Sequence, residues 1–91
     1  MTGTEFLIFR WEVRKKAADN LLHAGISKPK VAILGTTLDA LSLPLCQQAL
    51  GGDNGLDLDE LSQKDRAALV HAIALDVSTP ILEDYHAKTF A

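Results

Sequence analysis

Residues 27–50 read SKPKVAILGTTLDALSLPLCQQAL, and this stretch decides the fold that the sequence predicts. Its aliphatic residues recur at alternating spacings of three and four, which keeps one stripe on one side of a helix. The stripe consists of Val31, Leu34, Leu38, Leu41 and Leu45. Other apolar residues flank it, and a helix that is apolar nearly all round is normally central and buried. We therefore expect residues 27–50 to form the central helix of an all-α protein.

Capping residues mark both ends of this central helix, and one proline interrupts it. Ser27 is a good N-cap, Pro29 falls in the first turn, and Gly51 with Gly52 supplies a left-handed C-cap. Pro44 inside the helix would cost about 3 kcal/mol. We therefore predict a break near Ser42, a second short helix over residues 43–50, and a kink between the two parts.

The same segment also permits a strand. Residues 30–35, from Lys30 to Gly35, form a short apolar run that ends at a glycine, which is how a nucleotide-binding α/β unit opens. The leucine stripe, however, crosses Gly35 without changing phase, which favours the helix. The alternative fold is thus a small α/β unit with a strand at 30–35.

The chain of 91 residues predicts a single helical domain spanning residues 1–91. A body of this size buries only about 60 to 65% of its unfolded surface, yet 47% of its residues are apolar. We expect the apolar surplus to lie in an interface with another copy or another protein.

Signals of export and of membrane insertion are lacking in the sequence. The lone Cys46 has no partner for an internal disulfide, the apolar run at residues 6–9 follows Glu5 in place of a basic segment, and no run approaches the roughly 18 residues of a membrane span. We expect a cytoplasmic protein that does not bind membranes. Because the chain begins with Met1, we also expect it to be complete.

Helical signals continue on both sides of the central stretch. Residues 5–24 predict a helix with Thr4 as its cap and Gly25 as its C-cap, although residues 5–13 also alternate as a strand would. Residues 51–55 form a turn-rich loop, residues 58–76 predict a helix with an acidic first turn, and Ser78-Thr79-Pro80 predicts the start of a last helix over residues 81–88. The result is a bundle of four to five helices.

Catalytic and metal-binding patterns are weak. An EF-hand register that ends at Glu60 puts Ala49 and Gly51 where calcium needs carboxylates. The three histidines are far apart, and Cys46 has the setting of a buried, inert thiol. We expect no enzyme activity, no metal and no cofactor.

Charge and aromatic residues supply the candidate partner-binding residues. The first 30 residues carry six basic and three acidic side chains, whereas the rest carry three basic and nine acidic ones. Opposite signs in the two halves favour self-association or an acidic partner. The candidate residues are Phe9, Arg10, Trp11, Arg14, Lys15 and Tyr85, with Trp11 equally suited to the core.

The sequence therefore predicts a non-catalytic protein–protein interaction module or a small accessory subunit that forms homo-oligomers. One alternative is a helical DNA-binding regulator that uses the basic face from Arg10 to Lys16, although the chain is acidic overall and has no clear recognition helix. The second alternative is a small α/β ligand-binding unit or enzyme fragment, with the amides of residues 35–37 near a ligand.

Overall fold

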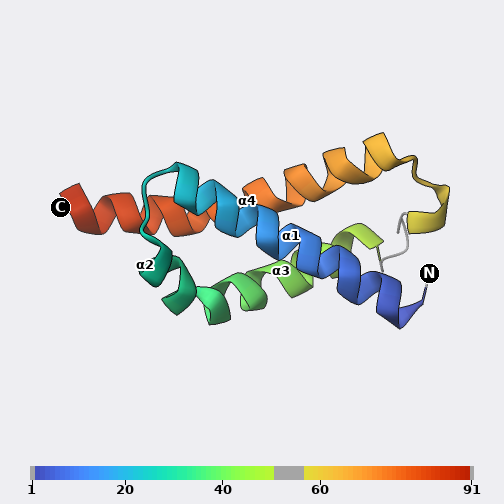
Figure 1. Ribbon diagram of the computed structural model, residues 1–91, viewed down its shortest axis with the longest axis horizontal. Coiled ribbons are helices and arrows are strands. Elements are labelled where there is room, and N and C mark those ends of the chain that lie inside the picture. Colours follow the sequence, from blue (N-terminus) through green and yellow to red (C-terminus); the bar gives the residue numbers. More distant parts are fainter. Residues whose placement is uncertain (1, 51–56, 91) are drawn as a thin grey trace.

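Four α-helices and one short 3-10 helix make up the described part of the chain. The computed structural model describes residues 2–50 and 57–90. The elements in order are α1 (Gly3–His23), α2 (Lys28–Ile33), α3 (Gly35–Leu50), η1 (Leu58–Glu60) and α4 (Gln63–Phe90) (Figure 1). Residues 30–33 are helical and Gly35 begins α3, so the α/β alternative is wrong. The all-α prediction is confirmed for the described residues.

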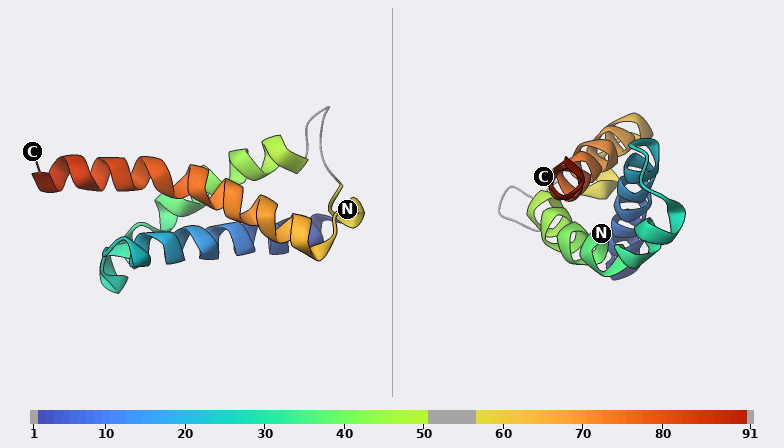
Figure 2. Two further views of the ribbon diagram at one scale, coloured as in Figure 1. Left: turned by 90° about the horizontal axis from the view of Figure 1, so that it is seen from above. Right: turned by 90° about the vertical axis from the view of Figure 1, so that its left-hand side faces the viewer.

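The three long helices lie alongside one another. α1 packs against both α3 and α4, and α3 also packs against α4. The end-on view in Figure 2 shows these three helices around a common interior, with the short α2 at one end of the bundle. The C-terminal part of α4 extends past the ends of the other helices (Figure 1), and the longest dimension of the molecule is 44 Å.

α1 is helical from its first turn, which settles the ambiguity at residues 5–13. The backbone N–H of Glu5 donates to the hydroxyl of Thr2 over 3.1 Å, so the cap is Thr2 and the predicted Thr4 lies inside the helix. The buried side of α1 is a row at four-residue spacing: Phe9, Val13, Ala17 and Leu21. Gly25 follows the helix with a φ of 98°, the left-handed geometry expected of a C-cap glycine.

The predicted helix break near Ser42 is wrong. The helical segment is interrupted at Leu34, between α2 and α3, instead. α3 continues through Pro44. The hydroxyl of Ser42 donates to the carbonyl of Leu38 over 2.6 Å, so this side chain is used within its own helix and not as a new cap. The carbonyl of Ala40 loses its donor at Pro44, and both residues are exposed. The structure does not confirm a kinked central helix.

α4 joins two segments that the sequence separates. Residues 58–60 form η1, and α4 begins after Ser62, whose hydroxyl accepts the N–H of Asp65 over 3.1 Å. The helix then runs through Pro80, so the predicted separate helix over residues 81–88 is wrong. The hydroxyls of Ser78 and Thr79 donate to carbonyls one turn earlier, over 2.9 and 2.7 Å, in the arrangement found at Ser42.

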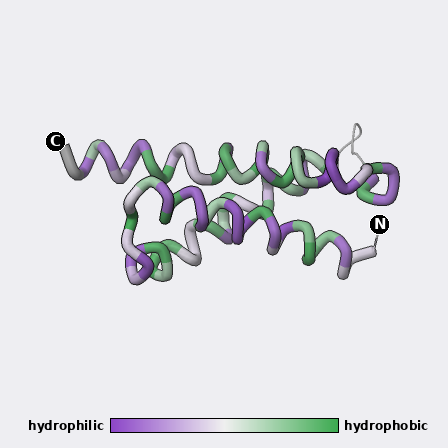
Figure 3. Tube along the Cα trace, turned by 45° about the horizontal axis from the view of Figure 1, so that its top comes forward, coloured by the Kyte–Doolittle hydropathy of each residue, from purple (hydrophilic) through white to green (hydrophobic). Residues whose placement is uncertain are grey.

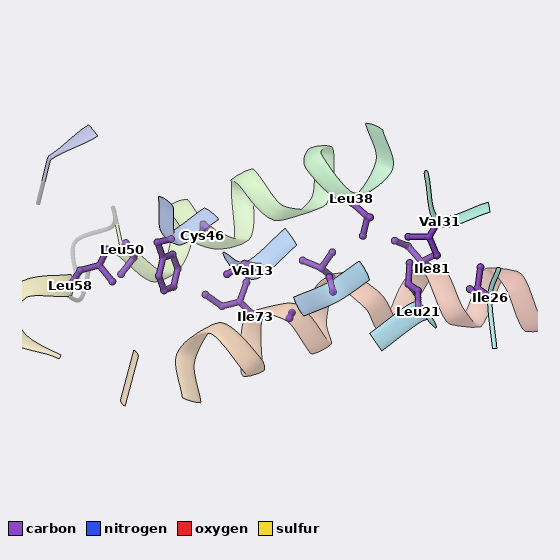
Figure 4. Close-up of a cluster of buried hydrophobic side chains, with 14 residues drawn as sticks. Val13, Leu21, Ile26, Val31, Leu38, Cys46, Leu50, Leu58, Ile73 and Ile81 are labelled. Carbon is purple, nitrogen blue, oxygen red and sulfur yellow. The ribbon is translucent and has the colours of Figure 1, made fainter. Parts of the chain in front are cut away.

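A single apolar cluster runs the length of the bundle. Leu50 and Leu58 lie at one end of it, and Ile26, Val31 and Ile81 lie at the other (Figure 4). Along each helix the apolar positions recur between polar ones, as the hydropathy colouring of the trace shows (Figure 3). Each long helix therefore contributes one apolar side to the core and leaves another side to solvent.

Two buried serines are the polar members of this core. Ser42 and Ser78 are 0% and 1% exposed. The side-chain amide of Asn20 also donates to the Ser78 hydroxyl over 3.4 Å and so links α1 to α4. Both hydroxyls donate to carbonyls of their own helices, which removes most of the cost of burying them.

Candidate interaction surface

The outward side of α1 exposes three large apolar side chains within one helical turn. Leu7, Ile8 and Trp11 are 59%, 50% and 61% exposed. We call these three residues the α1 patch. Leu7 and Trp11 lie opposite Phe9, because positions two residues apart on a helix point about 200° apart, and Ile8, one position before Phe9, points about 100° away from it. An N-terminal helix that is apolar on two sides has one side to spare for a contact.

Arg14 is fixed at the edge of this patch. Its Nε lies 2.6 Å from Oδ1 of Asp39 in α3, and its guanidinium carbon lies 5.4 Å from the centre of the Trp11 ring. Gly35 makes room for it, since a Cβ at that position would lie 2.9 Å from an Nη of Arg14. A shallow cavity of about 220 Å³ between α1 and α3 is lined by Leu7, Arg10, Trp11, Arg14 and Asp39. The indole therefore stands beside a positioned cation.

The other predicted partner-binding residues differ in exposure and lie in different parts of the structure. Phe9 is 0% exposed, so it is a core residue and does not offer its side chain to a partner on the surface of the folded chain. Lys15 is exposed on the outward side of α1. Tyr85 lies in the last part of α4, half-buried, with the ammonium of Lys30 4.7 Å from its ring centre. The structure thus gathers Trp11, Arg14 and Lys15 and separates Phe9 and Tyr85 from them.

Arg10 lies on the side of α1 that faces α3, where its charge acts on the thiol of Cys46, the single cysteine. Burial raises the pKa of the Cys46 thiol to about 11, and the positive charge of Arg10 acts in the opposite, weaker sense. Cys46 is fully buried and therefore remains a protonated, unreactive thiol at neutral pH. The expectation that Cys46 is buried is confirmed.

Leu7 and Ile8 are exposed residues that are not among the partner-binding residues predicted from the sequence. The signal was available: the row of Val13, Ala17 and Leu21, extended back by four residues, reaches Phe9 and leaves positions 7, 8 and 11 on the outside. The alternating pattern at the start of the chain concealed it, because it suits a strand as well as a helix.

A second surface feature is a groove between α1 and the first half of α4. It has a volume of about 870 Å³, and the residues that line it include Lys16, Leu61, Val70 and His71. Glu12 and Arg66 also line it and bridge the two helices. Their two hydrogen bonds run from Nε to Oε2 over 3.3 Å and from Nη2 to Oε1 over 3.1 Å. We call this feature the α1–α4 groove.

Metal-binding side chains do not gather in the described part of the chain. Within residues 2–50 and 57–90 there is no group of three or more His, Cys, Asp or Glu side chains that could hold a metal ion. The central part of the calcium-type loop and the glycines expected to cap the central helix fall at residues 51–56, outside the described residues. Among the described helices, none is both long enough and apolar enough to span a bilayer.

Comparison with models of known protein families gives no match to this chain, and neither do comparisons with curated proteins and with solved structures.

Proposed function

We propose that the protein is a small helical interaction module that self-associates through the α1 patch. The observation that carries this proposal is the exposure of Leu7, Ile8 and Trp11 side by side on one turn of α1. Single exposed apolar residues are ordinary on protein surfaces, as are Ile33 and Leu75 here. Three large ones on one turn, one of them a tryptophan, are typical of an interface.

Charges on both sides of the patch favour a second copy as the partner. Glu5 and Glu12 lie on the flank of α1 that faces α4, whereas Arg10 and Arg14 lie on the flank that faces α3. An apolar centre with Glu5 near one edge and Arg10 near the other is complementary to a copy of itself placed so that these opposite charges meet.

The expected association is weak. Stable dimers bury about 800 Å² on each partner, which is more than three side chains provide. Glu12 and Arg14 already have intramolecular partners, Arg66 and Asp39, so their charges steer the contact more than they strengthen it. We therefore expect a dissociation constant on the order of 100 µM.

Sedimentation velocity over a concentration series tests the proposal. The wild-type chain should shift from monomer to dimer as its concentration approaches the millimolar range. Ile8→Glu should remain monomeric, because it replaces one of the three apolar side chains of the patch by a charged one. Leu75→Glu is the matched control: it changes an aliphatic residue that is 45% exposed on α4, and it should still dimerise. A wild-type chain that stays a compact monomer at high micromolar concentration would contradict the proposal.

Nucleic-acid binding by the basic residues of α1 has less support from their positions. Arg14 is paired with Asp39, and Lys16 lines the α1–α4 groove on another side of the helix from Lys15. These cations therefore do not face one phosphate backbone. DNA binding through this helix would weaken steeply with salt and would be reduced on every sequence by Arg10→Ala with Arg14→Ala.

A further inference from the structure

The α1–α4 groove has the size of a small-molecule site. Its volume of about 870 Å³ lies within the roughly 300 to 1,000 Å³ that such sites occupy. Residues from three elements surround it: Lys16 from α1, Leu58 from η1 and Val70 from α4. The groove and the α1 patch use different sides of α1, so a ligand in the groove would leave the surface for self-association uncovered.

The floor of the groove is apolar. Leu58 is almost fully buried, and Leu61 and Val70 are half-buried against the core cluster. These aliphatic side chains offer an apolar ligand a surface already backed by packed core. A ligand body that covers Leu61 and Val70 would remove apolar surface from water, which is the usual source of affinity at such sites.

The polar rim of the groove has an excess of positive charge. The only carboxylate in its lining is that of Glu12, and both of its oxygens accept hydrogen bonds from Arg66. Lys16 and His71 also line the groove and form neither a hydrogen bond nor an ion pair with another described residue. The rim therefore offers one ammonium and one imidazole as donors to an anion, with the local acid already neutralised.

We propose that the α1–α4 groove binds an amphipathic organic anion, a medium-chain carboxylate. Its hydrocarbon chain lies on Leu61 and Val70, and its carboxylate accepts hydrogen bonds from Lys16 and His71. The apolar floor favours a hydrocarbon as the body of the ligand. The excess of positive charge at the rim favours a negatively charged head group. A neutral ligand of the same length forms no charge-assisted hydrogen bond with the rim donors.

Titration of the 91-residue chain with octanoate, followed by two-dimensional amide NMR, tests this assignment. We expect saturable binding of one octanoate per chain with a dissociation constant on the order of 1 mM, as suits a ligand of this size. The amides that shift should belong to residues around the groove, near positions 16, 61 and 70. Octan-1-ol is the matched neutral probe and should bind about tenfold more weakly, because it lacks the charge.

Two variants locate the head group. Lys16→Met should weaken octanoate binding about tenfold and leave octanol binding unchanged, and His71→Gln should weaken it by a smaller factor. Lys64→Met is the matched control, since Lys64 is exposed near the same end of α4 and does not line the groove. It should change octanoate binding by less than about twofold.

Several results would overturn the assignment. Octanoate that never saturates, octanol that binds as tightly as octanoate, or a Lys16→Met chain that binds like Lys64→Met would each do so. Shifts confined to residues 7, 8 and 11 would also do so, because they would place the ligand on the α1 patch. Self-association is measured separately, by sedimentation without octanoate.

Discussion

The inward and outward sides of α1 are both apolar, yet they serve different ends. On the inward side Phe9, Val13, Ala17 and Leu21 are all 0% exposed. On the outward side the three residues of the α1 patch are at least half exposed. The same helix therefore contributes to folding with one side and offers a contact with the other. The difference implies that stability and association can be changed separately by mutation.

The largest effect on folding is expected from the inward side. Phe9→Ala should lower the free energy of unfolding by about 3 to 5 kcal/mol, because it removes the largest fully buried side chain among the described residues and leaves a cavity. Urea unfolding followed by circular dichroism measures this. If the alanine variant does not fold, Phe9→Leu should still lose about 1 kcal/mol. An unchanged unfolding midpoint in Phe9→Leu would contradict the view that the inward side of α1 stabilises the fold and the outward side does not.

A smaller change in stability is expected from the titration of Cys46, which lies where α3 meets the bundle interior. Burial raises the pKa of Cys46 to about 11 from 9.0, so the folded state holds the thiol proton more tightly than the unfolded state does. The stabilisation is complete below about pH 9 and is lost as the pH rises through about 11. The expected loss is about 2 kcal/mol. Urea unfolding at both pH values measures it, and Cys46→Ala should show a smaller pH-dependent loss than wild type.

Asn20, at the contact between α1 and α4, should make a modest contribution to the stability of the fold. Asn20→Ala removes the 3.4 Å hydrogen bond to Ser78 and should cost about 0.5 to 1 kcal/mol, since the Ser78 hydroxyl keeps its bond to the Ala74 carbonyl. Thermal unfolding measures the change. Lys15→Ala, on the exposed side of the same helix, serves as the control and should change the unfolding temperature very little.

The smallest effect on folding is expected from the outward side. Trp11→Ala should change the free energy of unfolding of the monomer by less than about 0.5 kcal/mol, because the side chain is 61% exposed and only its contact with Arg14 is lost. Chemical unfolding in dilute solution, below the concentration of association, measures this. The same variant should lose dimerisation in sedimentation. A large loss of stability would show that Trp11 belongs to the core after all.

The sequence predicted where helices lie better than where they end. The prediction that Gly25 ends the first helix is confirmed, because a φ of 98° suits glycine and few other residues. The helix breaks predicted near Pro44 and Pro80 are wrong, because α3 and α4 run through these prolines. A serine two residues before a proline resembles a helix start, yet here Ser42 and Ser78 are buried and donate back to their own helices. Which use prevails depends on packing against other helices, and the local sequence does not contain that information.

The candidate surface was predicted in part for a related reason. The basic residues near Trp11 were identified, and helical periodicity places Trp11 opposite the buried row that begins at Phe9. Periodicity, however, does not say whether another segment covers the outward side of a helix. The α1–α4 groove was not predicted at all, because its residues come from distant parts of the chain and meet only through the packing of α1 against α4.

The position of the single tryptophan has a practical consequence. Trp11 is the only indole in the chain, and it stands in solvent beside a guanidinium in the folded monomer. Its fluorescence should therefore change little when the monomer unfolds and should shift to shorter wavelength when two chains meet. Intrinsic emission, usually a folding probe, would in this molecule report assembly.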